Sequence, residues 1–191
     1  MNEPNKKSVQ TTPDVLINFG ISEVNFKFIG KSAYISLKDS SLDIGHSMTQ
    51  EEIFNILNGM DEYTTNEKNP ATLITYEKWD DKTNFYTATV GKFMKSNTPV
   101  PDGMECFDIV STVGKGWFKT KPQNNEFSWD DYLFDGANMD LVKEAITQKG
   151  YKETSWMWHV DVLPMGYPTS VYTDDEGYAY YAIYISCEKN D

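Results

Sequence analysis

Cysteine and histidine are scarce in this chain, with two residues of each among 191. Two cysteines cannot build a disulfide framework, and neither Cys106 nor Cys187 lies in a CxxC motif or next to a histidine. His46 and His159 are far apart and have no matching Cys or Asp cluster, which argues against a zinc site. We therefore expect two buried free thiols, no metal and no cofactor.

Positive charge and long apolar runs are also lacking. The 17 lysine and arginine residues against 29 aspartate and glutamate residues give a net charge of -12, which repels nucleic-acid phosphates unless a basic face is segregated. The lysines occur singly or in pairs, and no stretch approaches the roughly 18 apolar residues that a membrane helix needs. The start of the chain has no apolar run behind its two lysines. We expect a cytoplasmic protein that binds neither nucleic acid nor membrane directly.

The composition that remains is that of a folded core. Hydrophobic residues make up 39% of the chain and aromatic residues 14%, and the length suits one domain better than two. Residues 1–23 are polar and include Pro4 and Pro13, so we expect a tail or a loosely attached strand there. The domain proper is predicted to span residues 24–191.

The first half of this domain reads as strand, helix, strand, strand. Residues 26–37 alternate as a strand does, and segments 71–79 and 85–93 read as a strand pair. Between them, Thr49 and Glu52 form a capping box at the start of a helix. Its apolar stripe has helical spacing and consists of Ile53, Phe54, Ile56, Leu57 and Met60.

The same order returns in the second half. Segment 104–119 is strand-like, residues 138–149 form a helix that Gly150 can end in the left-handed conformation, and segments 155–163 and 178–188 read as strands. Asn138 is the predicted N-cap of this helix. Internal repetition is the strongest organisational signal in the sequence.

The repetition predicts an α+β fold of two pseudo-symmetric strand-helix-strand-strand modules, at about 24–95 and 102–189. A helix needs an apolar sheet face to cover, so each module should be a small antiparallel sheet with its helix on one side. The other faces of the two sheets are then free to meet, and we expect a ligand cleft between the modules.

This doubled plan resembles the GyrI-like, or bacterial transcription-activator effector-binding, domain family over about residues 24–189. The similarity rests on Pro101-Asp-Gly-Met-Glu105, on Gly150-Tyr151, on the strand at 156–163 and on Ala182-Ile-Tyr-Ile-Ser186. In that family the cleft between the modules binds lipophilic, often cationic, drugs or dyes through stacked aromatic rings and a buried Glu. The resemblance thus implies a stand-alone bacterial domain with multidrug binding.

The resemblance also implies where ligand-binding residues lie. The family's Phe-Glu-x-Tyr strand falls on residues 158–161, so that His159 takes the place of the key Glu and Asp161 that of the Tyr. Alternation in this register turns His159 and Asp161 toward the cleft, whereas a slip of one residue would place Trp158 there instead. From the last strand Tyr180 and Tyr184 should face the cleft, and from the first module we add Tyr76 and Glu77.

The most direct interpretation is a protein that binds a lipophilic small molecule, including cations, for sequestration or sensing. Two alternatives remain open: a hydrolase acting on a reactive xenobiotic such as a cyclopropane-bearing toxin, and a protein-interaction module that inhibits a partner enzyme. A hydrolase would use His159 or Glu77 to activate water. The alternative to any functional role for His159 and Asp161 is that they lie on a solvent-exposed strand face. The sequence has no Gly-x-Ser-x-Gly motif and no phosphate-binding glycine loop, so catalysis is the weaker reading.

Overall fold

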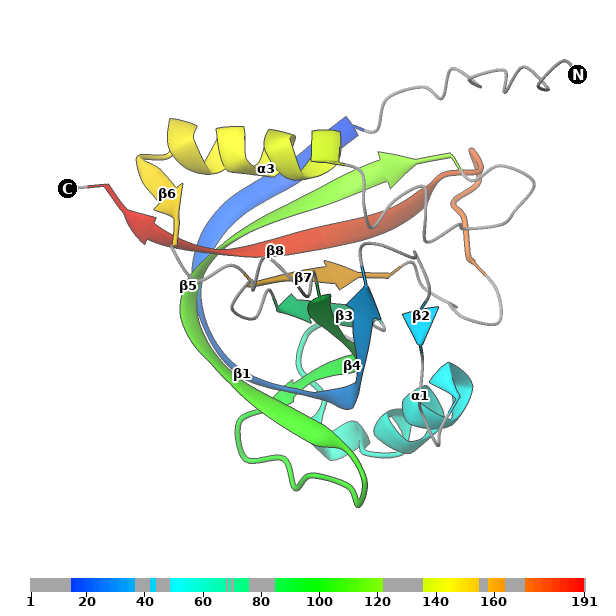
Figure 1. The fold of residues 1–191 in the computed structure, drawn as a ribbon. Helices are drawn as coiled ribbons and strands as arrows, with labels where there is room; N and C mark the ends of the chain where they lie inside the picture. The colour runs from blue at the N-terminus through cyan, green and yellow to red at the C-terminus, as the bar shows by residue number, and fades with distance from the viewer. Residues whose placement is uncertain are drawn as a thin grey trace, which may run out of the picture.

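In the part of the chain that the structure describes, the fold consists of antiparallel strands with two α-helices (Figure 1). The computed structural model describes residues 15–36, 42–43, 49–67, 69, 71–75, 85–121, 136–154, 158–163 and 171–190. Its elements are β1 (Val15–Ser36), β2 (Leu42–Asp43), α1 (Gln50–Asn58), the 3-10 helix η1 (Asp61–Tyr63), β3 (Ala71–Thr75), β4 (Phe85–Lys95), β5 (Glu105–Thr120), α3 (Gly136–Gln148), β6 (Tyr151–Glu153), β7 (Trp158–Val162) and β8 (Ala179–Lys189). The α+β class expected from the sequence is confirmed.

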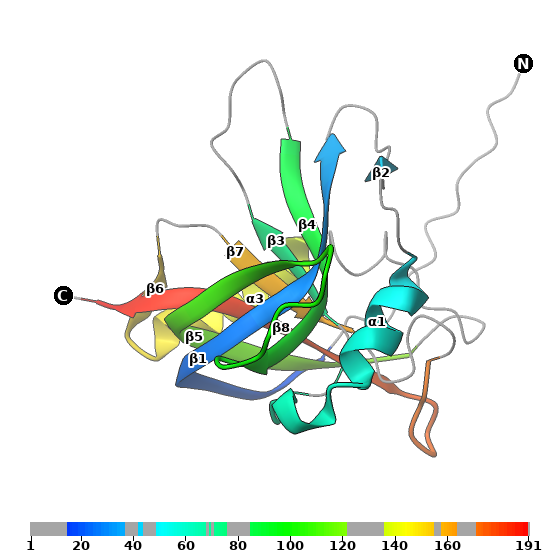
Figure 2. The same cartoon turned by 90° about the horizontal axis from the view of Figure 1, so that it is seen from below.

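The strands of both halves join in one sheet that closes on itself. Their order is β2-β1-β4-β3-β7-β8-β5, and β5 pairs again with β1, so the pairings form a ring. The long strand β1 makes closure possible, because its residues 26–36 pair with β4 while its residues 15–30 pair with β5. Figures 1 and 2 show β1 and β5 running side by side as long curved strands.

Each half of the ring has the same strand order. The first half is ordered β1-β4-β3 and the second β5-β8-β7, and the halves meet through the β3–β7 and β1–β5 pairs. The sequence predicted two sheets that meet across their faces, whereas the strands instead pair edge to edge. Edge pairing satisfies backbone groups that two separate small sheets would leave open at their edges.

Strand β1 begins earlier than the sequence suggested. Residues 15–23, expected to be part of a tail or a loosely attached strand, pair with β5 from Val15↔Lys119 to Glu23↔Thr112. The pairing is interrupted by an irregularity between Ile17 and Gly20, where Asn18 has a φ of 52°. Asparagine tolerates this left-handed conformation better than most residues, so the bulge sits at a suitable position.

Helix α1 begins as its local sequence predicts. The Thr49 hydroxyl accepts a hydrogen bond from the Glu52 amide at 3.2 Å, and the Glu52 carboxylate accepts one from the Thr49 amide at 2.7 Å. The helix packs on β4 through the buried side chains Ile53, Phe54 and Leu57. Ile56, which the stripe included, is 40% exposed.

Helix α3 lies at the other end of the molecule from α1, as Figure 1 shows. It packs over Gly114 and Gly116 of β5, where an added Cβ would come within 2.6 Å of Ile146 and 3.3 Å of Val142. Gly150 has a φ of +82°, which confirms the predicted left-handed stop. The predicted N-cap was wrong, because α3 starts at Gly136 and the buried Asn138 instead donates from Nδ2 to the Tyr181 hydroxyl.

Strands β1 and β4 approach each other closely at a pair of glycines. Gly30 and Gly91 are register partners, and a Cβ on Gly30 would lie 2.1 Å from the Val90 carbonyl oxygen. A Cβ on Gly91 would lie 2.0 Å from the Ile29 carbonyl oxygen. Both positions therefore require glycine.

Candidate functional site

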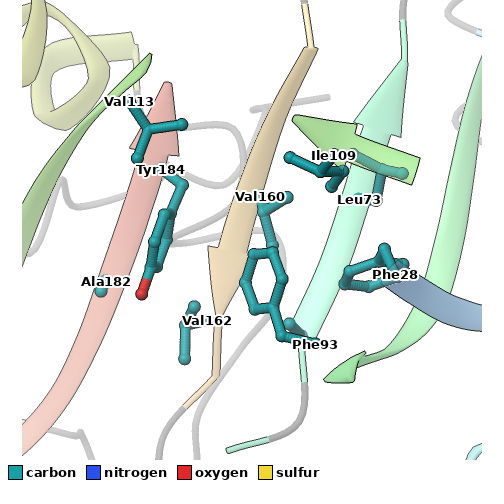
Figure 3. Close-up of a cluster of buried hydrophobic side chains, with 10 residues drawn as sticks. Phe28, Leu73, Phe93, Ile109, Val113, Val160, Val162, Ala182 and Tyr184 are labelled. Atoms are coloured by element: carbon teal, nitrogen blue, oxygen red, sulfur yellow. The ribbon is translucent and has the colours of Figure 1, made fainter. Parts of the chain in front are cut away.

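The inner face of the ring is an apolar cluster to which β1, β3, β4, β5, β7 and β8 all contribute. We call it the interior cluster; its buried members are Phe28, Ala71, Leu73, Phe93, Ile109, Val113, Val160, Val162, Ala182 and Tyr184. In Figure 3 the side chains of Phe93 from β4, Val160 from β7 and Tyr184 from β8 project into the same space. The Phe93 ring lies 5.0 Å from the Tyr184 ring and 5.5 Å from the Phe28 ring, distances typical of favourable aromatic pairs.

The Glu67 carboxylate reaches this apolar interior. Glu67 follows η1 in an irregular segment and is only 8% exposed. Its backbone is held by Thr65, whose hydroxyl accepts from the Glu67 amide at 3.2 Å and lies 3.0 Å from the Glu67 carbonyl and 3.3 Å from the Phe93 carbonyl. Asn69 anchors the same segment further on by donating to the Leu163 carbonyl at 3.0 Å. The segment is thus tied to both β4 and the end of β7.

The Glu67 carboxylate has two side-chain partners from adjacent strands. Lys115 Nζ lies 2.6 Å from Glu67 Oε2, and the Tyr184 hydroxyl donates to the same oxygen at 3.1 Å. Lys115 and Tyr184 are direct register partners of β5 and β8, so both side chains leave the sheet on the same face. A buried carboxylate is costly unless it is paired and hydrogen-bonded, and this one is both.

The ammonium group of Lys115 also lies over two aromatic rings. Its Nζ is 4.6 Å from the centroid of the Trp117 ring and 4.7 Å from that of Tyr184, within the range of cation–π attraction. Glu67, Lys115, Trp117 and Tyr184, with Phe93 behind Tyr184, are called the carboxylate–aromatic site below. Apart from the Lys115 ammonium group, its groups attract a positive charge: one carboxylate, one phenol and two π-faces.

Burial and the Glu67 charge act together on the phenol. The pKa of Tyr184 is raised well above its ordinary value, first by burial, then by the negative charge of Glu67 and by the hydrogen bond to it. Each of these effects favours the neutral phenol over the phenolate. Tyr184 therefore stays a hydrogen-bond donor at any physiological pH.

Two of the predicted binding residues lie on the interior face. Tyr184 is a buried member of the interior cluster, and Trp158 packs against it half-buried. Val160 is the register partner of Tyr184 and lies inside with it. Trp158, Val160 and Tyr184 therefore share the interior face of the ring.

The expected facing of His159 and Asp161 was wrong. They are register partners of Ile185 and Ile183, which belong to the cluster under α3, so they leave the sheet on the face opposite to Tyr184. His159 Nε2 lies 3.3 Å from Asp161 Oδ2, and each residue is 3% exposed. The pair is therefore neither an exposed strand face nor a partner to a ligand held beside Tyr184.

The remaining predicted residues have other positions. Tyr180 donates its hydroxyl to Asp174 at 2.7 Å, and the same carboxylate accepts from the amides of Glu176 and Tyr178, which organises the exposed loop before β8. Tyr76 and Glu77 lie outside the described residues. Tyr180 thus has a structural contact that accounts for its hydroxyl.

Glu67, Lys115 and Trp117 were missed by the sequence reasoning. Glu67 comes from an irregular segment with no periodicity to place it on a face. For Lys115 and Trp117 the sequence did contain a signal. They alternate with Gly114 and Gly116 along one strand, so both must lie on the face opposite to the two glycines. A lysine between two glycines in a strand is the sequence signal at this position.

One of the two cysteines is buried and the other is exposed. Cys187 is buried as predicted, whereas Cys106 is exposed and that prediction was wrong. Within the described ranges, no group of three or more His, Cys, Asp and Glu side chains is arranged to hold a metal ion. None of the helices described here has the length and apolarity needed to cross a membrane.

Comparison with known proteins gives a likeness in fold. No protein-family model and no curated protein sequence matches this chain. A solved structure does match. It is SAV2435 bound to tetraphenylphosphonium, similar over 90% of this chain and 94% of its own, with a TM-score of 0.53 and 7% sequence identity. At that identity the likeness establishes a shared fold, and GyrI-like membership stays a prediction.

Two other solved structures are more weakly similar. One is an integron cassette protein from the mobile metagenome of Vibrio cholerae, with a TM-score of 0.42, 11% identity, and coverage of 93% of this chain and 100% of its own. The other is EcmrR in a complex with DNA, with a TM-score of 0.48 and 11% identity. The match covers 90% of this chain and 57% of EcmrR.

Proposed function

We propose that this protein binds lipophilic small molecules, cations among them, at the carboxylate–aromatic site, and that it acts in sequestration or sensing. The observation that supports this most is the buried Glu67 carboxylate that accepts from the Tyr184 hydroxyl, with an ammonium group already held 4.6–4.7 Å from the centroids of the Trp117 and Tyr184 rings. A desolvated carboxylate and aromatic faces are the two features that recognise an organic cation.

The fold likeness supports the same proposal. The neighbour SAV2435 was solved with tetraphenylphosphonium, a lipophilic cation. The shared strand order of the two halves also supports reading this chain as two related modules, as the GyrI-like resemblance implies. In this proposal Trp158 and Tyr184 are ligand-binding residues, and Glu67 supplies the buried negative charge.

Calorimetric titration with tetraphenylphosphonium tests the proposal. For stacking of this kind we expect a dissociation constant in the micromolar range, which corresponds to a binding free energy on the order of -8 kcal/mol. Glu67→Gln should weaken binding of the cation because it removes the buried charge. The matched control is Glu176→Gln, since Glu176 also pairs with a lysine, Lys119 at 3.2 Å, but is 73% exposed. Equal affinities in the two variants would remove Glu67 from the site.

A further inference from the structure

We infer that Lys115 is a tethered competitor for organic cations and sets the charge preference of the carboxylate–aromatic site. This inference rests on the function proposed above. Its basis is that the Lys115 ammonium occupies the position that a ligand cation would take. It is 2.6 Å from Glu67 and lies over the rings of Trp117 and Tyr184.

Charge arithmetic gives the first step. Glu67 and Lys115 bear opposite unit charges at neutral pH, so together they present a site with no net charge to a ligand. A cation entering beside Glu67 must displace the ammonium group or share the carboxylate with it. A neutral or anionic ligand of the same shape meets no such competitor. With Lys115 in place the site therefore selects less strongly for cations than its acidic and aromatic groups alone would.

Exposure gives the second step. The Lys115 side chain is 24% exposed while Glu67 is 8% exposed, so the lysine lies nearer to solvent than its partner. Its ammonium group can move into water, where it is well hydrated, without crossing the interior cluster. The carboxylate has no comparable path, because Thr65 and Asn69 hold its segment on β4 and β7. Lys115 is thus the movable member of the pair.

A second lysine on the same strand provides a matched control. Lys119 lies 3.2 Å from Glu176 and 3.9 Å from the centroid of the Tyr178 ring, so it repeats the combination of carboxylate and aromatic ring. Its carboxylate partner is 73% exposed, outside the interior cluster. Any general effect of removing one positive charge from β5 should appear equally in both lysine variants.

The test compares two ions of the same shape and opposite charge, tetraphenylphosphonium and tetraphenylborate. In Lys115→Met we expect the affinity for tetraphenylphosphonium to rise about tenfold, because this cation no longer has to displace the Lys115 ammonium group from Glu67. The affinity for tetraphenylborate should fall, because the site has lost its positive charge. Methionine is close to lysine in length, and a purely steric effect would move both affinities in the same direction. Lys115→Arg retains the positive charge and should keep the parent's preference between the two ions, and Lys119→Met should also leave that preference unchanged.

A measurement on the unaltered protein avoids any loss of folding in the variants. Acetylation of lysines by N-hydroxysuccinimide acetate, followed by peptide mass spectrometry, reports how available each amine is. Saturating tetraphenylphosphonium should increase acetylation of Lys115, because its amine leaves Glu67 for solvent, and should leave Lys119 unchanged. Unchanged or reduced acetylation of Lys115 in the complex would overturn the inference.

The outcomes separate this inference from the proposed function. If the parent binds tetraphenylphosphonium and Lys115→Met keeps the same preference between the two ions, the inference is wrong while the proposed function stands. If neither ion binds to the parent, to Lys115→Met or to Lys115→Arg, the proposed function fails and the inference fails with it.

Discussion

We expect the hydrogen bond from Tyr184 to Glu67 to contribute measurably to stability. Tyr184→Phe removes the hydroxyl that donates to Glu67 Oε2 at 3.1 Å and leaves the ring, with its neighbour Phe93 at 5.0 Å, in place. A hydrogen bond to a charged group contributes about 1.5–3 kcal/mol. Glu67 keeps its contact with Lys115 at 2.6 Å, so we expect the lower part of that range, about 1.5–2 kcal/mol.

Urea unfolding followed by tryptophan fluorescence measures this loss. The midpoint should fall with an unchanged m-value, because the surface exposed on unfolding is nearly the same in both proteins. For a chain of this size the melting temperature should fall by about 3–8 °C. Tyr180→Phe is the control: its hydroxyl donates to Asp174 at 2.7 Å in an exposed loop, so its loss should be smaller. A loss in Tyr184→Phe no larger than in Tyr180→Phe would refute the reasoning.

Burial and Glu67 raise the pKa of Tyr184, so this group's contribution to the free energy of unfolding is fully present below about pH 10, where unfolded tyrosine begins to ionise, and is lost as pH rises further. In that range the free energy of unfolding of Tyr184→Phe should therefore depend less on pH than that of the parent. Gly30→Ala should destabilise the protein by about 3 kcal/mol, since its Cβ would lie 2.1 Å from a carbonyl oxygen, whereas Gly20→Ala, with no atom within 4 Å, should stay within about 0.5 kcal/mol of the parent in the same assay. His159→Gln should not alter the affinity for tetraphenylphosphonium, because His159 faces away from Tyr184; weakened binding in calorimetry would contradict this assignment.

Local sequence predicted the features whose partners lie a few residues away. The start of α1 depends on Thr49 and Glu52 alone, and both hydrogen bonds of the capping box form. Gly150 takes its positive φ for an equally local reason. Repetition along the chain predicted the order of strands and helices, although β1 extends further toward the N-terminus than its composition indicated.

Alternation predicted which residues share a face, but not which face is the inner one. In β8 it separated Tyr184, which lies in the interior cluster, from Ile183 and Ile185, which lie under α3. In β7 the same period of two placed His159 with Asp161, and the borrowed alignment then turned both toward the wrong side. Alternation with a period of two sorts residues onto two faces but does not identify the inner face, which depends on how the neighbouring strands pair.

The sequence by itself determined the class of fold, the order of its elements, the start of α1 and the acidic, aromatic character of the chain. Tertiary structure alone decided that β1 closes the sheet into a ring, that Trp158 rather than His159 faces inward, and that Glu67 and Lys115 meet beside Tyr184. Glu67 and Lys115 are 48 residues apart, and Glu67 and Tyr184 are 117 apart. Their meeting depends on which strands pair, and strand pairing is a property of the whole ring that no local pattern encodes.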